Sequence, residues 1–203
     1  KALQSLARHE EALCLCDEAL SAFPEVHPDF EIWMRYRKGM CLAELGRHDE
    51  AIEILRSALR RKTVWFIRHA LAKAYAGNKD LDSALRYGVE AVAIDNCNEM
   101  GRRWEILLTI AQVLMACNEN DMAKKHAAYA AGERRRMGWG ANTKLDSVCR
   151  GLGVTDGDID SSHDLKPELE KYWQSVRLSL SPRGTGTVAN LLPSRAGFIK
   201  GDD

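Results

Sequence analysis

The chain has 203 residues, of which 45% are hydrophobic and 29% are charged, and its 29 Lys and Arg are balanced by 29 Asp and Glu. This composition is ordinary for a folded domain, and the zero net charge excludes binding to nucleic acid or anionic membranes through overall charge. No apolar run reaches the roughly 18 residues of a membrane-spanning helix. The 6 cysteines show no disulfide-framework spacing, which predicts a reducing, cytoplasmic setting. The chain starts at Lys1, inside a helical pattern, so an upstream segment is compatible with the sequence.

Four segments in the first 137 residues repeat one pattern. Each has a polar turn, an acidic or amide residue, and two alanines seven residues apart. A helical segment with a small residue and a larger one three positions on, such as Gly39 and Leu42, precedes the last three turns. A small residue lets a neighbouring helix approach closely, so the pattern predicts helix-turn-helix units that each bury a face on the next. The alanine pairs are Ala12 and Ala19, Ala51 and Ala58, Ala84 and Ala91, and Ala123 and Ala130.

This pattern resembles the tetratricopeptide repeat family, whose unit is a helix-turn-helix of about 34 residues. The resemblance covers residues 1–137, as three full repeats and the second half of an earlier one. It departs at the tryptophan-like position, which holds Arg35, Arg68 and Leu107, and the closing proline survives only as Pro24. Two spacings of 39 residues predict longer connections at residues 24–29 and 95–101. The resemblance implies an all-α fold, a right-handed superhelical stack of antiparallel helix pairs (an α-solenoid) with a short β-like tail; an irregular helical bundle is the alternative.

Residues 138–181 are expected to hold capping or linker helices. Pro167 suits the first turn of a helix over residues 166–180. The acidic run at residues 155–168 resembles a calcium loop, but Ser161 and Pro167 occupy the positions that need glycine and glutamate. We therefore expect a solvated linker with a helix cap there.

Residues 182–203 form the third predicted segment, with strands over residues 185–191 and 196–200. They resemble the opening of a cold-shock domain, a small five-stranded OB-type barrel. Residues 186–188 and 197–199 carry the match, whereas residues 189–191 lack the aromatics that stack on bases in that family. The resemblance implies an incomplete domain with Phe198, Arg195 and Lys200 as candidate nucleic-acid contacts. An ordinary β-hairpin packed on the final helix is the alternative.

In tetratricopeptide proteins, the first helices of the units line a concave groove that binds an extended peptide or a helix. Stepping round these helices by three and four residues assigns the groove face here. Its aromatic, Met and Arg residues are types enriched in binding hot spots, and Arg37, His69 and Lys73 predict a partly acidic, partly apolar ligand. Alternatively, Trp33 and Phe66 pack against the neighbouring repeat. The predicted groove residues are Trp33, Tyr36, Arg37, Met40, Glu44, Phe66, His69, Lys73, Leu108, Gln112 and Met115, with Glu105 on the same face.

The chain carries no recognisable catalytic or metal-binding motif. Cys14 and Cys16 lie two residues apart, so on a helix they point to different faces. No nucleophile-elbow, zinc-protease or phosphate-loop pattern occurs. The sequence therefore predicts no enzyme activity, no catalytic residue, no metal and no cofactor.

The sequence thus predicts a scaffold that binds a protein or peptide in its concave groove and does not enter membranes. The alternative is a nucleic-acid-associated regulator, whose complete C-terminal domain binds RNA or single-stranded DNA while the repeats recruit partners. Basic clusters such as residues 60–62 and 134–136 are compatible with that alternative, but cations are also favoured at helix C-termini. A third hypothesis is self-association through the truncated first unit, residues 1–22, whose apolar edge lacks a cap.

Overall fold

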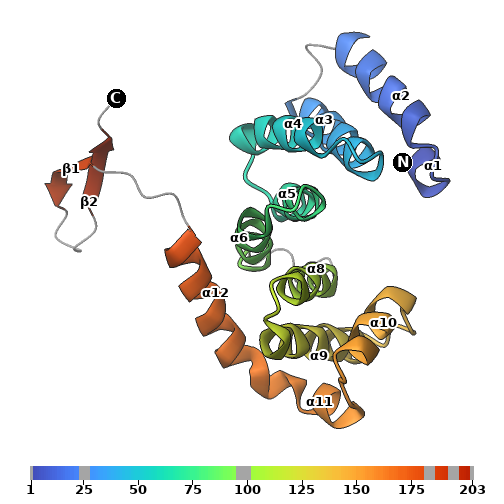
Figure 1. The fold of residues 1–203 in the computed structure, drawn as a ribbon. Helices are drawn as coiled ribbons and strands as arrows, with labels where there is room; N and C mark the ends of the chain where they lie inside the picture. The colour runs from blue at the N-terminus through green and yellow to red at the C-terminus, as the bar shows by residue number, and fades with distance from the viewer. Residues whose placement is uncertain (1, 23–27, 95–101, 181–185, 192–196, 202–203) are drawn as a thin grey trace.

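The structure, a computed structural model, describes residues 2–22, 28–94, 102–180, 186–191 and 197–201 (Figure 1). Up to residue 180 the described chain is helical, which confirms the all-α prediction. The two longer connections expected at residues 24–29 and 95–101 fall largely outside the described residues. The helices are α1 (Ala2–Ser5), α2 (His9–Ala22), α3 (Pro28–Glu44), α4 (His48–Arg61), α5 (Trp65–Gly77), α6 (Leu81–Val92), α8 (Arg103–Ala116), α9 (Asn120–Arg136), α10 (Thr143–Gly151), α11 (Asp156–Asp160), the short 3₁₀ helix η1 (Ser162–Leu165) and α12 (Lys166–Leu180).

The helices pack as neighbouring pairs in chain order. α3 packs on α4, α5 on α6 and α8 on α9, and each pair contacts the next through α4 with α5 and α6 with α8. Figure 1 shows α3, α5, α8 and α10 along one side of the row, and α4, α6 and α9 along the other. On the first side, α3 touches α5, α5 touches α8, and α8 touches α10. That side is therefore built from the first helices of three successive units, followed by α10.

The repeating alanines occupy the contacts between helices. Ala51, Ala58, Ala91, Ala123 and Ala130 are fully buried. At Gly39 of α3 an added Cβ would lie 2.5 Å from Leu55 Cγ on α4, so the two helices approach closely there. Small residues at these positions are what allows each pair to close, as the sequence pattern predicts.

One turn geometry recurs in all four units. Ala7, Gly46, Lys79 and Asn118 each have a positive φ, of 56°, 76°, 65° and 61°. After each, the next amide N–H donates to the carbonyl five residues earlier, at 2.9 to 3.1 Å. This is the left-handed C-terminal cap of the Schellman motif, which satisfies carbonyls left over at a helix end. The four turns are therefore equivalent in backbone conformation, although only one of them uses glycine at the position with positive φ.

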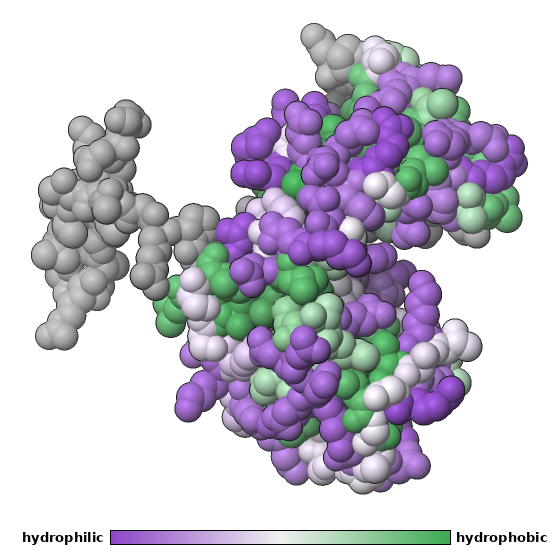
Figure 2. Space-filling view, in the orientation of Figure 1, coloured by the Kyte–Doolittle hydropathy of each residue, from purple (hydrophilic) through white to green (hydrophobic). Residues whose placement is uncertain are grey.

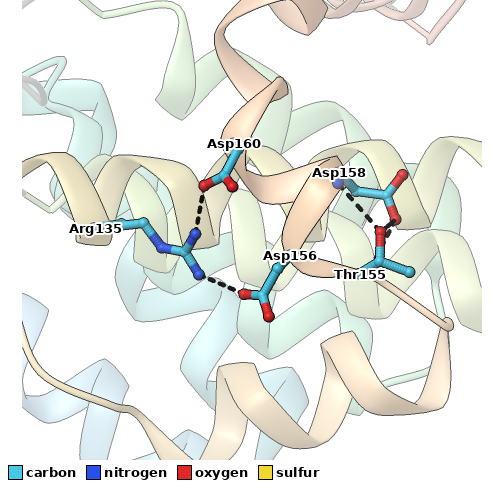
Figure 3. Close-up of polar contacts among 5 residues, drawn as sticks. All are labelled: Arg135, Thr155, Asp156, Asp158 and Asp160. Carbon is cyan, nitrogen blue, oxygen red and sulfur yellow. Dashed lines mark hydrogen bonds and ion pairs between the residues drawn. The ribbon is translucent and has the colours of Figure 1, made fainter.

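The acidic run at residues 155–168 forms α11 and η1, which pack on α9, in place of the linker expected there. The expected helix cap is present at Thr155, and most of the run is exposed. Arg135 of α9 binds Asp156 at 2.7 Å and Asp160 at 2.5 Å, and Thr155 and Asp158 cap the start of α11 (Figure 3). Ser162, the first residue of η1, is fully buried. Tertiary contacts therefore fold a segment whose composition is typical of a loop.

The helix expected over residues 166–180 is present as α12, which crosses α6 and α9. Leu169, Trp173 and Val176 form its buried face. The Trp173 Nε1–H donates to His126 Nε2 of α9 at 2.9 Å, and His126 is fully buried. Figure 2 shows apolar side chains gathered where α12 meets α6. The helix therefore packs as part of the core, on the side of the row opposite α3, α5 and α8.

The C-terminal strands β1 (Gly186–Leu191) and β2 (Gly197–Gly201) pair antiparallel, close to the bounds expected from the sequence. Arg195 and the side chains of Phe198 and Lys200 lie outside the described part of the structure. Among the helices that the structure describes, none has both the length and the apolar character needed to span a bilayer. At the other end, Leu6 and Leu15 of the first unit are 66% and 54% exposed. Self-association through this edge stays a prediction.

Candidate ligand-binding groove

Three aromatic side chains meet across two helices of the α3–α5–α8 side. Trp33 of α3 stacks on Phe66 of α5, with ring centroids 4.6 Å apart and planes 9° from parallel. Tyr36, one turn after Trp33, meets both rings edge-on at 5.9 and 4.9 Å. Trp33 is nevertheless 43% exposed. Trp33 and Phe66 therefore pack together across neighbouring repeats, as the alternative predicts, and Trp33 also presents an aromatic surface. Binding of a ligand at this surface stays a prediction.

A pocket of about 140 Å³ opens beside this aromatic cluster. Tyr36 and Phe66 form one wall, and Met40, Ala43 and Ala70 extend the apolar surface along α3 and α5. Burial raises the pKa of the Tyr36 hydroxyl, so it stays protonated at neutral pH. Six predicted groove residues converge on this pocket: Tyr36, Met40, Glu44, Phe66, His69 and Lys73.

Charged side chains line the rim of the pocket in pairs of opposite sign. Lys73 Nζ lies 3.9 Å from a Glu44 carboxylate oxygen, and Arg102 Nη1 lies 3.0 Å from a Glu105 carboxylate oxygen. Glu44 and Lys73 are each about half exposed, so this pair contributes little to stability and can rearrange around a ligand. The rim is therefore charged but close to neutral.

His69 differs from the cation predicted at this position. Its Nε2 lies 2.8 Å from Thr109 Oγ1 of α8. Burial, with a smaller effect from the nearby charge of Lys73, lowers the pKa of His69 to about 3. The ring is therefore neutral at physiological pH, and only Lys73 and Arg102 supply positive charge around the pocket.

The other predicted groove residues do not line this pocket. Leu108 is in the core, 8% exposed, and Met115 packs against the core. Gln112 lines a second hollow of about 500 Å³ between α5 and α8, which shares Lys73 with the first. Arg37 does not line either hollow. Its positive charge instead partly offsets the rise in pKa that burial causes in the Cys16 and Cys41 thiols, toward α2.

Sequence reasoning missed Thr109 and Arg102. On α8 the groove face runs through Glu105, Thr109 and Gln112, whereas steps of three residues select Leu108. A step of four residues from Glu105 leads to Thr109, a polar residue in an otherwise apolar stretch. This spacing is the sequence feature that could have placed Thr109 on the groove face. Arg102 precedes α8 and gave no periodic signal.

Many side chains of the basic clusters are paired at the surface with carboxylates or aromatic rings. Arg135 is paired as described above, and Arg134 lies 4.3 Å from the ring centre of Trp104. Because their charges are already partnered, these clusters offer fewer free cations to a nucleic-acid backbone than the sequence suggests. The other pairs are Arg61–Glu31, Lys62–Asp29, Lys124–Asp158, Lys125–Asp121, Lys125–Glu168 and Arg136–Glu133.

Cys14 is exposed and Cys16 is buried, which confirms that they face different directions. Burial raises the pKa of the Cys149 thiol to about 11 and also raises that of Cys16. These buried thiols therefore stay protonated and act as apolar side chains. Within the described ranges, no three His, Cys, Asp or Glu side chains gather in a way that could hold a metal ion.

The family model described as "Domain of unknown function (DUF7017)" matches residues 32–151. This range runs from the first turns of α3 to the end of α10 and contains both hollows of the groove. No curated protein and no solved structure matches the chain. Because the match covers more than half of the 203 residues, the chain belongs to the DUF7017 family.

Proposed function

We propose that this protein is a tetratricopeptide-like α-solenoid, a right-handed superhelical stack that serves as a scaffold. It binds a peptide or helix of a partner protein in the groove lined by α3, α5 and α8. The observation that carries the proposal is the exposed Trp33, stacked on Phe66 beside a pocket that six predicted groove residues line. Exposed aromatics around an apolar hollow with a polar rim are typical of protein-binding surfaces.

The repeat architecture supports this proposal. The four turns share one backbone conformation, with residues at positive φ spaced as the alanines are. Stacked pairs place the first helix of each unit on the same side, as α3, α5 and α8 are. Such a side forms a continuous surface along which an extended ligand touches several repeats.

The pocket favours a ligand that is mainly apolar, with charges of both signs at its edges. Its walls are aromatic and aliphatic, and the rim pairs Glu44 with Lys73 and Arg102 with Glu105. Because His69 is neutral and Arg37 lines neither hollow, a ligand with charges of both signs is favoured over the partly acidic, partly apolar ligand predicted from Arg37, His69 and Lys73. Lys79 and Lys73 line the second hollow, and none of the described residues that line it carries a carboxylate. The second hollow can therefore bind one acidic group of the ligand.

The test begins with selection of short peptides from a random library on the wild-type protein. A Trp33→Ala/Tyr36→Ala/Phe66→Ala variant removes the aromatic surface, and its far-UV circular dichroism must match that of the wild type. Loss of a single hot spot weakens binding by about thirtyfold or more, and we expect at least that loss here. The single variant Trp33→Ala serves if the triple variant is poorly folded, because Trp33 is the most exposed of the three.

The matched control removes three exposed apolar side chains outside the groove, as Met137→Ala/Trp139→Ala/Leu178→Ala. We expect the control to bind the selected peptides like the wild type. Peptides that bind the aromatic triple variant with the wild-type affinity contradict the groove proposal. Peptides that lose affinity only for the control variant contradict it as well. Binding of single-stranded RNA or DNA that none of the selected peptides displaces favours the nucleic-acid alternative instead.

A further inference from the structure

His69 contributes one ring nitrogen to the scaffold and leaves the other to the pocket. Its Nε2 lies 2.8 Å from Thr109 Oγ1, so the contact joins α5 to α8, neighbours on the groove side (Figure 1). The Thr109 hydroxyl lies 3.1 Å from the Glu105 carbonyl oxygen and donates to it. Thr109 is 8% exposed, so this small network is shielded from water.

The network determines the tautomer of His69. A hydroxyl has one proton, and that of Thr109 is used on the Glu105 carbonyl. Toward His69 the hydroxyl oxygen therefore accepts, and Nε2 must carry the ring proton. With the pKa of the imidazole lowered to about 3, the ring holds no second proton at neutral pH. Nδ1 is thus a bare hydrogen-bond acceptor.

Nothing in the described part of the chain donates to this acceptor. The only hydrogen bond of the His69 side chain there is the one at Nε2. Because His69 lines the 140 Å³ pocket and its Nε2 is used on Thr109, Nδ1 is the ring nitrogen left for a ligand there. An acceptor without a partner favours a donor that arrives with a ligand.

The rest of the pocket defines what can carry that donor. The rings of Tyr36 and Phe66 stand edge-on to each other with centroids 4.9 Å apart, and Met40 lies on the same wall. Aromatic rings and a thioether favour another aromatic ring. The positive charge of Lys73 acts on His69 and disfavours a ligand cation next to the ring, although Glu44 and Glu105 lie on the same rim.

We infer that the pocket selects an aromatic side chain that carries a hydrogen-bond donor, tyrosine or tryptophan, on a peptide segment of the partner protein. The ring packs against Phe66 and Tyr36, and the O–H or N–H donates to His69 Nδ1. Thr109 acts as a positioning residue, because its hydroxyl keeps the proton on Nε2. The inference rests on the proposed groove function and adds the specificity of its central pocket.

The first experiment titrates the protein with N-acetyl-tyrosinamide and N-acetyl-phenylalaninamide, two probes that differ by one hydroxyl. Binding is followed by the NMR signals of the α3, α5 and α8 backbone amides. A site built to receive a hydroxyl donor rejects the analogue that lacks it, so we expect the tyrosine probe to bind about fivefold more tightly. Equal dissociation constants for the two probes, or no shift with either, overturn the inference.

Two variants separate the acceptor from the general shape of the pocket. His69→Leu removes Nδ1 and is expected to bring the ratio of the two dissociation constants close to one. Thr109→Val keeps the shape of Thr109 and removes only the hydroxyl, and it is expected to lower the same ratio without loss of helicity. Thr63→Val, at an exposed threonine outside the pocket, is the control that leaves the ratio unchanged. A His69→Leu protein that keeps the full preference for tyrosine overturns the assignment.

The tautomer can be observed directly. A long-range ¹H–¹⁵N spectrum of the histidine rings distinguishes a protonated Nε2 from a protonated Nδ1, and we expect the Nε2–H form for His69 at neutral pH. A proton on Nδ1 overturns the inference. The groove proposal is decided separately by the selected peptides and the aromatic triple, so it can stand when the tyrosine preference fails.

Discussion

Acid should destabilise this protein through His126, at the contact between α9 and α12. His126 is fully buried, its Nε2 accepts from Trp173, and its Nδ1–H donates to the Met122 carbonyl at 2.7 Å. Protonation would place a second N–H where Trp173 already points a donor. The neutral ring is therefore part of how α12 is held.

The magnitude follows from the change in pKa. Burial lowers the pKa of His126 to about 4, against about 6.5 in an unfolded chain, and the hydrogen bond to Met122 opposes this only in part. Between those values the unfolded chain binds a proton that the folded protein does not. The stabilisation is fully present above about pH 6.5 and is lost as the pH falls toward 4. The full loss is about 3 kcal/mol, of which about 2 kcal/mol falls between pH 7.5 and 5.

The assay is urea unfolding followed by far-UV circular dichroism at both pH values. His126→Gln keeps a side chain that can accept from Trp173 and donate to Met122 but does not titrate. We expect the variant to lose about 2 kcal/mol less than the wild type between the two pH values. His163→Gln, at an exposed histidine, is the control and should follow the wild type. Parallel pH curves for the wild type and His126→Gln would refute the reasoning.

Two further predictions concern the repeat geometry and can be checked by the same unfolding assay. Gly39→Ala places a Cβ 2.5 Å from Leu55 Cγ, and we expect a loss of about 1 to 3 kcal/mol from overpacking; Gly151→Ala meets nothing within 4 Å and should cost nothing. Equal effects of the two alanines would contradict the close approach of α3 and α4. Lys79→Gly relieves a left-handed residue with φ of 65° and should gain up to about 1 kcal/mol. Lys144→Gly, inside α10, should instead lose about 1 kcal/mol, and a destabilised Lys79→Gly protein would contradict the assigned turn.

The repeat could be predicted from the sequence because its cause is local and periodic. Ala51 and Ala58 lie two turns apart on α4 and both have to be small to let neighbouring helices approach. The same need recurs in each unit, so it leaves a visible pattern. Ala19, in the first unit, is only half-buried, where no preceding helix of the described chain covers it.

The details of the groove could not be predicted, because they depend on contacts between distant residues. His69 and Thr109 are 40 residues apart, and only the packing of α5 on α8 brings them together. From the sequence alone, which does not show that contact, His69 is predicted to be a surface cation. Similarly, the sequence around Asp156 and Asp160 is typical of a solvated run, and only the fold brings Arg135 of α9 to bind both. A rotation of one residue on α8 exchanges Leu108 for Thr109 at the groove, and periodicity alone does not resolve it.

The central claim is that the α3–α5–α8 side binds a partner peptide, and mapping where a selected peptide binds tests it most directly. The measurement is a titration of isotope-labelled protein with the tightest selected peptide, followed by backbone amide shifts. We predict that the largest shifts lie on α3, α5 and α8, around Trp33, Phe66 and His69, with the shifts on α4, α6 and α12 small. Shifts concentrated on α4, α6 and α12, with the aromatic cluster unchanged, would contradict the account.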